Sequence, residues 1–413
     1  MRLTQQSLTI VLASMMLFAC AASGKTPPAA NDDSSAPVIS VPRIVAIGDV
    51  HGDYDQFVKL LQVSGLINKR NKWIGGDAHL VQLGDIPDRG PDTRKTMDLL
   101  IKLEKSAARK GGAVTVLIGN HEAMNMIGDL RYVHPGEYKA FVDRNSKARQ
   151  QAYYEQTKAW LRANLPVDEL PTFDVDHKVA WKKKYPLGYA EHRLAWAPAG
   201  KYGKWVLSRP AVAVVGDSLF VHGGIAPEYQ AMPVTEINTR VRTALAIGES
   251  LAEGSIVDDP NGPLWYRGWV TAPASDQSLT ALQSVLDAYG VKRMVVAHTP
   301  VLPIVLPRFG GRFVIIDVGL SEAYGRGFSA LEIVEGQARA IFGERRLLLP
   351  DEPGMEALNA YLLAAQPFAS NPEKVANYRE KFVTPALLQA ANSDNHTPDE
   401  QAETGAEPAA ASN

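Results

Sequence analysis

The sequence predicts an α/β layered domain, and two observations support this fold class. Short apolar runs end repeatedly in glycine followed by a polar residue, at residues 44–49, 80–85 and 114–120. Uninterrupted apolar runs of this length are typical of strands buried on both faces. Segments whose apolar residues have helical spacing follow the first two runs, which gives the order β-α-β-α-β. In such a sheet, the loops at the carboxyl ends of the strands are the expected place for a ligand site.

The N-terminal residues predict a lipoprotein signal peptide rather than part of the fold. The apolar run Leu8–Ala19 follows Arg2 and is too short to span a bilayer, but it suits a secretory signal. It ends in Leu17-Phe18-Ala19-Cys20, which resembles a bacterial lipobox, the motif whose cysteine receives lipid after cleavage. We therefore expect a signal peptide over residues 1–20 and lipidation of Cys20. A plain signal peptide with a chance cysteine is the alternative.

This anchor predicts a place in the bacterial cell envelope, facing the periplasm. Ala21 and Ala22 follow the cysteine, and the absence of aspartate directly after it favours the outer membrane. Because Cys20 is the only cysteine, the rest of the chain has neither a disulfide nor a cysteine nucleophile. The net charge of −2, without a basic stripe, argues against nucleic acid as a partner. The sequence leaves the oligomeric state open.

Composition divides the remainder of the chain into three parts. Residues 21–40 are rich in Ala, Ser and Pro without apolar periodicity, so we expect a flexible tether there. Residues 393–413 are acidic and Ala-rich, and they predict a disordered tail. Residues 41–392 form the predicted folded domain. Within it, residues 128–203 break the strand rhythm and predict an insertion beside the site, with helical character over Glu137–Leu165.

Later segments continue the α/β pattern. Strands are expected at residues 211–215, 218–221, 293–297 and 313–316. Apolar residues over Leu279–Tyr289 predict an amphipathic helix, capped by Ser275 or Asp276 and closed by Gly290. This helix leads into the strand that ends at His298.

Three successive strand ends carry residues that bind metals. Asp49 and His51 lie two positions apart between glycines, so a carboxylate and an imidazole can face one ion. Asp85 follows the second strand, and its carboxylate can bridge two ions. The third strand ends in Gly-Asn-His-Glu at 119–122, where the amide oxygen of Asn120 is an acceptable hard ligand. One such motif alone is more often a loop feature than a site, but three in order on successive strand ends indicate a metal centre.

Two later strand ends add histidines. His222 precedes Gly-Gly, and His298 precedes Thr-Pro. A lone histidine is more often a core residue than a ligand. Here the two histidines complete a ligand set that otherwise lacks nitrogen donors.

Together these motifs closely resemble the phosphoprotein phosphatase branch of the calcineurin-like metallophosphoesterases. They read Asp-x-His-Gly, Gly-Asp-x-x-Asp-Arg-Gly, Gly-Asn-His-Glu, His-Gly-Gly and His-Thr. Residues 122–133 and 263–268 resemble the Shewanella-like protein phosphatases, and the whole resemblance covers about residues 41–341. It implies a sandwich of two mixed β-sheets flanked by helices, with a helical insertion. It also implies a dinuclear-metal phosphatase that hydrolyses phosphomonoesters.

The resemblance further implies the metal ligands by position. One ion would bind Asp49, His51 and Asp85, and the other would bind Asp85, Asn120, His222 and His298. Two divalent ions about 3.5–4 Å apart polarise phosphate oxygens and lower the pKa of a bridging water, which is the nucleophile. Mn²⁺ is the expected metal, and iron and zinc also fit mixed nitrogen and oxygen ligands.

Residues around the metals take roles from the same resemblance. His121 would protonate the leaving group as general acid, with Asp88 orienting its ring. Arg89 and Arg267 would bind phosphoryl oxygens together with Asn120. Arg267 rests on one branch-specific segment, and a structural ion pair is its alternative.

The substrate is narrowed only to a class. The resemblance suggests a phosphoprotein, with serine, threonine and tyrosine all open. A nucleotide or dinucleoside polyphosphate hydrolase is the alternative, and a non-catalytic binding lipoprotein on the same fold is an alternative of another class.

Two residues depart from the commoner superfamily pattern. Asp53 stands where many eukaryotic relatives carry Gln, and Ala297 stands where many relatives carry Gly.

Several other polar or aromatic residues are expected to play no part in the chemistry. Solvent exposure or local hydrogen bonding is expected for His79, His134, His177 and His192. Packing is expected for Trp160, Trp181 and Trp196.

Overall fold

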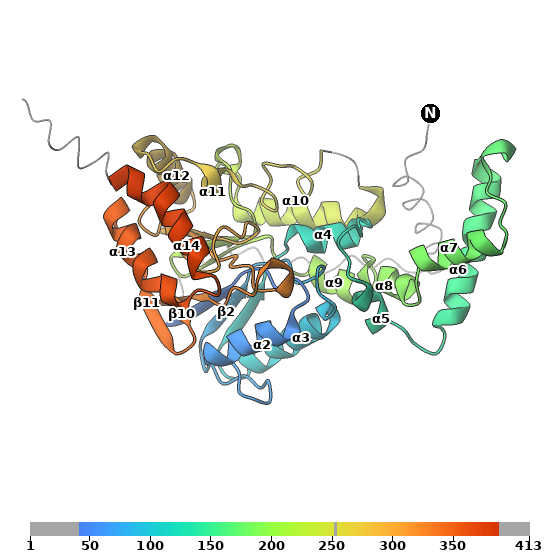
Figure 1. The fold of residues 1–413 in the computed structure, drawn as a ribbon, viewed down its shortest axis with the longest axis horizontal. Coiled ribbons are helices and arrows are strands. Elements are labelled where there is room, and N and C mark those ends of the chain that lie inside the picture. The colour runs from blue at the N-terminus through green and yellow to red at the C-terminus, as the bar shows by residue number, and fades with distance from the viewer. Residues whose placement is uncertain (1–40, 252–253, 388–413) are drawn as a thin grey trace, which may run out of the picture.

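The computed structural model describes residues 41–251 and 254–387, in which two β-sheets are flanked by helices (Figure 1). The predicted signal peptide, Cys20, the tether and the tail over 393–413 lie outside these residues. Within the described ranges, no helix combines the length and the apolar composition that a membrane crossing requires.

The first sheet has six strands in the order β11-β10-β9-β1-β2-β3. Its strands are β1 (Arg43–Ile47), β2 (His79–Gln82), β3 (Ala113–Val116), β9 (Ala330–Val334), β10 (Gln337–Phe342) and β11 (Arg345–Leu348). The three predicted strands β1, β2 and β3 run parallel, with Val45 beside Leu80 and Leu80 beside Val114. The strands β9 to β11 add antiparallel pairs to this core, and the sequence analysis did not predict them.

The second sheet has five strands in the order β4-β5-β6-β8-β7. They are β4 (Val212–Val215), β5 (Ser218–Val221), β6 (Arg293–Val296), β7 (Leu306–Arg308) and β8 (Phe313–Ile315). The pairs β5–β6 and β6–β8 are parallel, whereas β4 and β7 pair antiparallel at the edges. Parallel strands in both sheets bring many strand ends to one side of the sandwich, because parallel strands share their direction.

Helices flank the two sheets (Figure 1). They are α2 (Tyr54–Val63), α3 (Thr93–Ala108), α4 (Asn120–Ile127), α10 (Val234–Ile247), α11 (Gly268–Thr271), α12 (Asp276–Ala288), α13 (Met355–Ala365) and α14 (Pro372–Tyr378). Short turns of helix lie at Val167–Glu169, Pro227–Tyr229, Gly248–Ser250, Glu322–Tyr324, Gln366–Phe368 and Arg379–Val383. Of the two predicted caps of α12, Ser275 and Asp276, the cap is Ser275, whose side chain accepts a hydrogen bond from the backbone N–H of Ser278.

The insertion folds as five helices. They are α5 (Pro135–Ala140), α6 (Ser146–Asn164), α7 (Val175–Lys184), α8 (Tyr189–Trp196) and α9 (Lys201–Leu207). Helical structure therefore continues past residue 203 to Leu207. The helical character predicted over Glu137–Leu165 is present in α5 and α6, which are separated by a turn at Asp143. Its carboxylate accepts from the N–H of Asn145, and its own N–H donates to Ser146 Oγ.

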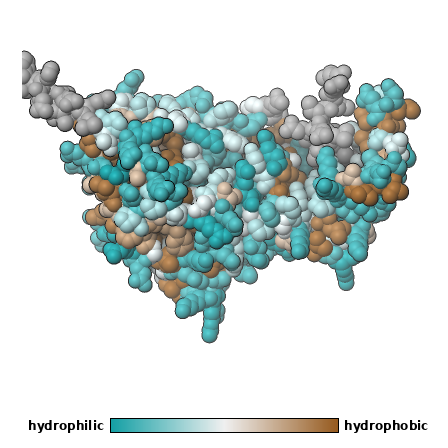
Figure 2. All heavy atoms as spheres, viewed as in Figure 1, coloured by the Kyte–Doolittle hydropathy of each residue, from teal (hydrophilic) through white to brown (hydrophobic). Residues whose placement is uncertain are grey.

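Helices α6 and α7 form an arm that projects to one side of the molecule (Figure 1). A small apolar core of its own supports the arm, built from Tyr153, Tyr154, Trp160, Leu161, Trp181, Tyr185 and Tyr189. Trp196 instead belongs to the main core between the sheets and helices. The arm also exposes apolar residues, with Val167 86% and Val175 77% exposed. Figure 2 shows hydrophobic and hydrophilic side chains next to each other on it.

Candidate metal centre

Six predicted ligands meet where strands of both sheets end. The first sheet contributes residues that follow β1, β2 and β3, and the second contributes residues that follow β5 and β6. They are Asp49, His51, Asp85, Asn120, His222 and His298, and none is more than 7% exposed. Side chains that lie far apart in the sequence therefore share one buried site.

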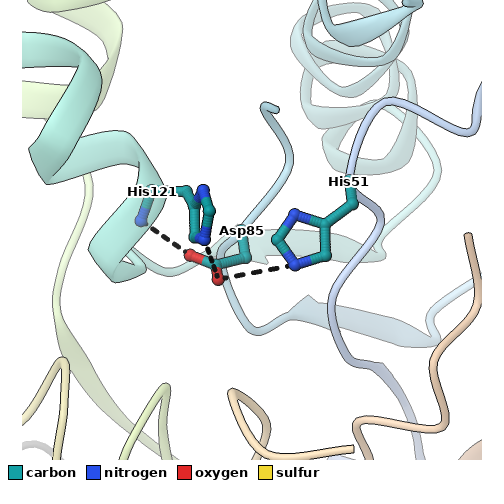
Figure 3. A group of neighbouring side chains, drawn as sticks. All are labelled: His51, Asp85 and His121. Carbon is teal, nitrogen blue, oxygen red and sulfur yellow. Dashed lines mark hydrogen bonds and ion pairs between the residues drawn. The ribbon is translucent and has the colours of Figure 1, made fainter. Parts of the chain in front are cut away.

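Asp85 lies at the centre of this site. Its Oδ2 atom lies 3.3 Å from His222 Nε2 and 3.8 Å from both His51 Nε2 and His121 Nε2. Figure 3 shows the last two imidazoles converging on the carboxylate. Ligand atoms that each lie about 2.0–2.2 Å from one cation are separated by such distances. The geometry of Asp85 therefore suits a carboxylate that binds two ions.

Two groups of ligand atoms share Asp85. One consists of His51, Asp85 and His121, and the other of Asp85, His222 and His298, with the atoms of each group within 4.8 Å of one another. Asn120 joins the second group, since its Oδ1 lies 2.9 Å from His222 Nε2.

Asp49 joins the two groups. Its Oδ2 lies 3.6 Å from His51 Nε2, and its Oδ1 lies 3.8 Å from His222 Nδ1 and accepts from the N–H of His298. The first group differs from the implied ligand set, because it contains His121 where Asp49 was expected.

Hydrogen bonds to the backbone orient two of the imidazoles. His222 Nδ1 donates to the carbonyl of Leu83 at 2.7 Å, and His51 Nδ1 donates to the carbonyl of Pro87 at 3.1 Å. Each bond leaves Nε2 directed at Asp85, where it could bind a cation once it carries no proton. Metal-binding histidines commonly use their second nitrogen in this way, because it fixes the tautomer and the ring.

The electrostatics of the carboxylates favour a bound cation. Burial raises the pKa of Asp49 well above its ordinary value, and the charges of Asp317 and Asp85 add to the shift. Burial also opposes ionisation of Asp85, but the positive charges of His222 and His121 outweigh it and hold the pKa of Asp85 well below its ordinary value. A cation would stabilise all of these carboxylates in their charged form.

The pKa values of the two histidines in the second group, His222 and His298, are shifted in opposite directions. Against the effect of burial, Asp85 and Asp49 raise the pKa of His222 to about 9. Burial, together with the charge on His222, lowers the pKa of His298 to about 2. His298 Nε2 is also buried and has no hydrogen-bond partner. In the absence of metal, His222 therefore carries the positive charge and His298 is neutral, with His222 Nε2 3.2 Å from His298 Nδ1. The donor set fits a divalent cation, which would take the place of the proton on His222 Nε2.

Strained backbone places several of these side chains. Positive φ angles occur at His51 (47°), Asp85 (53°), Asp88 (73°), Arg89 (66°) and His298 (67°), five of the ten such non-glycine residues in the described ranges. Conformations of this kind cost energy and cluster at functional sites. Gly119 is required for the same packing, since a Cβ there would lie 2.3 Å from Asp85 Oδ1.

Glu122 holds the Asp85 loop in place. Its carboxylate accepts hydrogen bonds from the backbone N–H groups of Asp85, Ile86 and Gly119, each at 2.8 Å. Glu122 thereby ties the second strand end to the third. Its motif was recognised from the sequence, but this role was not.

His121 lies in the first turn of α4 and contacts two carboxylates. Its Nδ1 lies 2.5 Å from Asp88 Oδ2, and its backbone N–H donates to Asp85 Oδ1 at 2.9 Å. The Asp88 contact leaves Nε2 directed toward Asp85. This arrangement suits a proton donor, and the same nitrogen also lies in the first group of potential ligands.

Comparison with known proteins agrees with this geometry. A family model described as calcineurin-like phosphoesterase matches residues 42–302, more than half of the chain. The chain belongs to the calcineurin-like phosphoesterase family. It is a metal-dependent phosphoester hydrolase built on two mixed β-sheets flanked by helices, as the resemblance in the sequence implied.

Similar proteins indicate which branch of the family this chain resembles. An uncharacterized protein of Schizosaccharomyces pombe is 31% identical, over 73% of this chain and 81% of its own length. Shewanella-like protein phosphatase 2 of Arabidopsis thaliana is 30% identical, over 70% of this chain and 75% of its own. A solved structure, the cold-active protein-tyrosine phosphatase of a psychrophile Shewanella species, is 25% identical with a TM-score of 0.56 and covers 75% of this chain and 81% of that chain. The predicted resemblance to the Shewanella-like protein phosphatases is confirmed.

The two arginines predicted to bind phosphate, Arg89 and Arg267, occupy different environments. Arg89 is half-buried, with its guanidinium 3.9 Å from the ring of Tyr132 and 5.7 Å from that of Tyr324. Arg267 is exposed at the start of α11, and its Nη1 lies 3.5 Å from the carbonyl of Trp265. The positive charge of Arg267 contributes to the low pKa of His298, which places it near the second group.

Sequence reasoning missed other residues near the centre. Asp317 follows β8, is 3% exposed and acts on the pKa of Asp49. The predicted strand over 313–316 ends directly before it, so the rule that found Asp49 and Asp85 would also have indicated Asp317. Tyr132 lies in the segment 122–133 that resembles the Shewanella-like protein phosphatases, but no role was assigned to it. No motif indicated Tyr324, because its position depends on how distant loops pack.

Most of the discounted residues lie in local contacts. His79 contacts Thr115, His134 caps α5, and His177 contacts Tyr154. His192 was interpreted wrongly, since it is fully buried and neither ring nitrogen has a hydrogen-bond partner. Aromatic rings of Tyr138 and Phe141 pack against it instead. Asp53, which stands where many relatives carry Gln, also has a local role. It caps α2 and accepts a hydrogen bond from the backbone N–H of Glu322.

Proposed function

We propose that this phosphoesterase removes phosphate from phosphotyrosine in proteins or peptides. The main observation in support is the position of Arg89 beside Tyr132 and Tyr324 at the edge of the metal centre. The Tyr132 ring lies 5.3 Å from His121, and the Tyr324 ring lies 5.1 Å from His51. A phosphoryl group bound by Arg89 would carry its leaving group into aromatic surroundings. An aryl group packs favourably there, whereas a serine side chain is too small to use the rings.

The names of similar proteins support this choice. The Arabidopsis relative is named a protein phosphatase, and the Shewanella structure is titled a protein-tyrosine phosphatase. Proteins named bis(5'-nucleosyl)-tetraphosphatases also match, with 25% identity for the one from Buchnera aphidicola, below the 30% of the Arabidopsis relative. A nucleotide substrate is therefore the second candidate.

The chain's own residues would divide the chemistry as follows. Asp49, His51, Asp85, Asn120, His222 and His298 would hold two divalent cations, for which Mn²⁺ is our proposal. When bound, such cations polarise phosphate oxygens and lower the pKa of an attacking water. Arg89 and Arg267 would bind the phosphoryl oxygens with bidentate hydrogen bonds, aided by Asn120. His121 would donate a proton from Nε2 to the leaving oxygen, while Asp88 stabilises the imidazolium through Nδ1.

Location is part of the proposal. A lipid on Cys20 would anchor the phosphatase in the bacterial envelope, facing the periplasm and on the outer membrane. Its support is the lipobox-like run in the sequence, with Ala21 and Ala22 after the cysteine.

The substrate is tested by comparing kcat/KM on matched substrates with Mn²⁺-reconstituted protein. A phosphotyrosine peptide, the same peptide with phosphoserine, and diadenosine tetraphosphate are compared, with His222→Ala as the background control. We expect the phosphotyrosine peptide to lead by roughly 10- to 100-fold, and Tyr324→Leu to reduce this lead. Equal rates on the two peptides, or faster cleavage of the dinucleotide, would overturn the proposal.

A further inference from the structure

Glu137 lies in the insertion, yet its side chain reaches the loop that carries Asp88. Its Oε1 accepts a hydrogen bond from the backbone N–H of Asp88 at 2.8 Å. Glu137 is 1% exposed, so this is a buried contact between helix α5 and a loop that follows β2. A buried backbone N–H without an acceptor is costly, which makes this acceptor important.

The Asp88 loop needs external support. Asp88 and Arg89 both have positive φ angles, of 73° and 66°. Side chains rarely adopt this conformation unless surrounding contacts impose it. Glu137 accepts from the N–H of Asp88, and the carbonyl of Tyr132 accepts from the N–H of Arg89 at 3.0 Å. The segment from Tyr132 to Glu137 therefore fixes the backbone of two successive residues at the site.

The carboxylate of Asp88 is fixed separately. Its Oδ2 contacts His121 Nδ1, and its Oδ1 accepts from Asn125 Nδ2 at 3.0 Å. Asn125 Nδ2 also donates to the carbonyl of His121 at 3.0 Å. Helix α4 thus orients the side chain of Asp88, while Glu137 of α5 orients its backbone.

The surroundings of Glu137 favour its neutral form. Burial raises the pKa of Glu137 well above its ordinary value, and the charge of Asp88 adds to this. Its Oε2 has no hydrogen-bond partner and lies 3.9 Å from Nε2 of His192. Burial lowers the pKa of His192 well below its ordinary value, so this imidazole carries no compensating charge. A neutral carboxyl group still accepts the Asp88 N–H through its carbonyl oxygen, and a glutamine would do the same.

We propose that Glu137 is a positioning residue for phosphate hydrolysis, which sets the backbone of Asp88 from the insertion and thereby aligns the ring of His121. The inference rests on the general-acid role proposed for His121. It assigns the insertion a direct part in the reaction, besides any contact with the substrate. Loss of the acceptor would let Asp88 shift and would weaken proton transfer to the leaving group.

The test compares three variants of the full-length, Mn²⁺-loaded protein. Glu137→Gln keeps an acceptor oxygen, Glu137→Met removes it at similar size, and Glu191→Met is the control. Glu191 lies in the same insertion and pairs with Arg149 at 2.8 Å. Turnover is measured on phosphoserine, whose leaving group needs a proton, and on nitrophenyl phosphate, whose leaving group departs as an anion. Metal content and thermal melting are recorded for each protein.

We expect Glu137→Gln and Glu191→Met to keep most of the wild-type turnover on both substrates. Glu137→Met should lose roughly 10- to 100-fold in kcat on phosphoserine, less on nitrophenyl phosphate, and little in KM or bound metal. If Glu137→Met does not fold, Glu137→Asp, which withdraws the acceptor by one methylene group, takes its place with the same expectation.

Two outcomes separate this inference from the proposed function. An equal loss on both substrates, or equal behaviour of the Gln and Met variants, would overturn the role of Glu137. His121→Asn is measured in parallel. If it shows no dependence on the leaving group, the acid role itself is wrong. If His121→Asn shows the dependence and Glu137→Met does not, only the positioning role is wrong.

Discussion

The Nδ1 atom of His121 lies 2.5 Å from Asp88 Oδ2, while its Nε2 lies 3.8 Å from Asp85 Oδ2. One ring nitrogen therefore contacts a carboxylate outside the ligand set, and the other faces the carboxylate shared by both groups. A proton donor in this arrangement would release its proton from Nε2 while Nδ1 donates to Asp88. A carboxylate at Nδ1 also orients metal-binding histidines, so this geometry fits both a proton donor and a ligand.

His121→Asn separates these two roles. If His121 is the general acid, the variant should keep both metals and lose roughly 10²–10⁴-fold in kcat on phosphoserine. The loss should be smaller on nitrophenyl phosphate, because nitrophenolate leaves without a proton. Metal analysis and turnover on both substrates provide the check. Loss of metal, or an equal defect on both substrates, would make His121 a ligand instead.

Several parts of this site could be predicted from the sequence, for a physical reason. Asp49, Asp85 and Asn120 each follow a buried apolar strand, and parallel strands bring their carboxyl ends to one edge of a sheet. Local order along the chain was therefore enough to find them. The structure brings all six predicted ligands together with His121 and Asp88, although their roles stay predictions.

The parts that could not be predicted depend on packing between distant segments. Tyr324 follows β8 in the chain, and its ring lies 5.1 Å from that of His51, which follows β1. Glu137 reaches Asp88 because α5 packs beside α3 near the same loop. The strands β9 to β11 were missed because no polar motif marks their ends, and β10 and β11 alternate only weakly between buried and exposed residues. Such contacts have no signature in local composition.

His222→Ala should deplete bound metal together with activity. His222 Nε2 lies within 3.3 Å of atoms from Asp85, Asn120 and His298, so its removal takes a nitrogen donor from the second group. We expect less than two metal ions per chain and at least roughly 100-fold lower turnover on every substrate. Elemental analysis after dialysis gives the metal content, with His79→Ala as a control histidine outside the site. Full metal content in His222→Ala would contradict the assignment.

Metal-free protein should lose stability as pH rises from about 6.5 to about 9. The folded-state pKa of His222 is raised to about 9, so its stabilising contribution is complete below the unfolded value near 6.5 and is lost as pH rises through 9. The raised pKa of Asp49 acts in the same direction, and His298, with a pKa near 2, affects only lower pH. The expected loss is up to about 3 kcal/mol, or several degrees in melting temperature.

Metal-loaded protein should not show this decline, because its histidines bind as neutral imidazoles. Denaturant unfolding with and without a chelator, at four pH values across the window, makes the comparison. A parallel decline in both forms would show that His222 does not carry the proton.

Cys20→Ser should release the protein from membranes. Lipid on the cysteine supplies the anchor we propose, and none of the described helices can cross a bilayer. Fractionation of cells that express each form should place wild type with membranes and the variant in the soluble periplasm. Identical partition of the two forms would remove the lipid anchor from the proposal.

The arm of α6 and α7 should affect protein substrates more than small ones. Lys182, Lys183 and Lys184 are exposed at the end of α7, and they form a positive group on a chain whose net charge is −2. Positive charges of this kind attract acidic phosphoproteins, and salt screens the attraction. Replacing the three lysines with glutamine should lower kcat/KM on an acidic phosphoprotein roughly 3- to 10-fold at low salt and leave nitrophenyl phosphate nearly unchanged. The variant keeps Glu137 and the arm's aromatic core, so the metal centre should be unaffected.

Stopped assays at 20 mM and 300 mM salt test the idea, because the Debye length is long at the lower concentration and short at the higher one. The difference between wild type and variant should vanish at 300 mM salt. A difference that persists at high salt, or an equal loss on nitrophenyl phosphate with loss of metal, would mean that the lysines support the fold and do not recruit substrate.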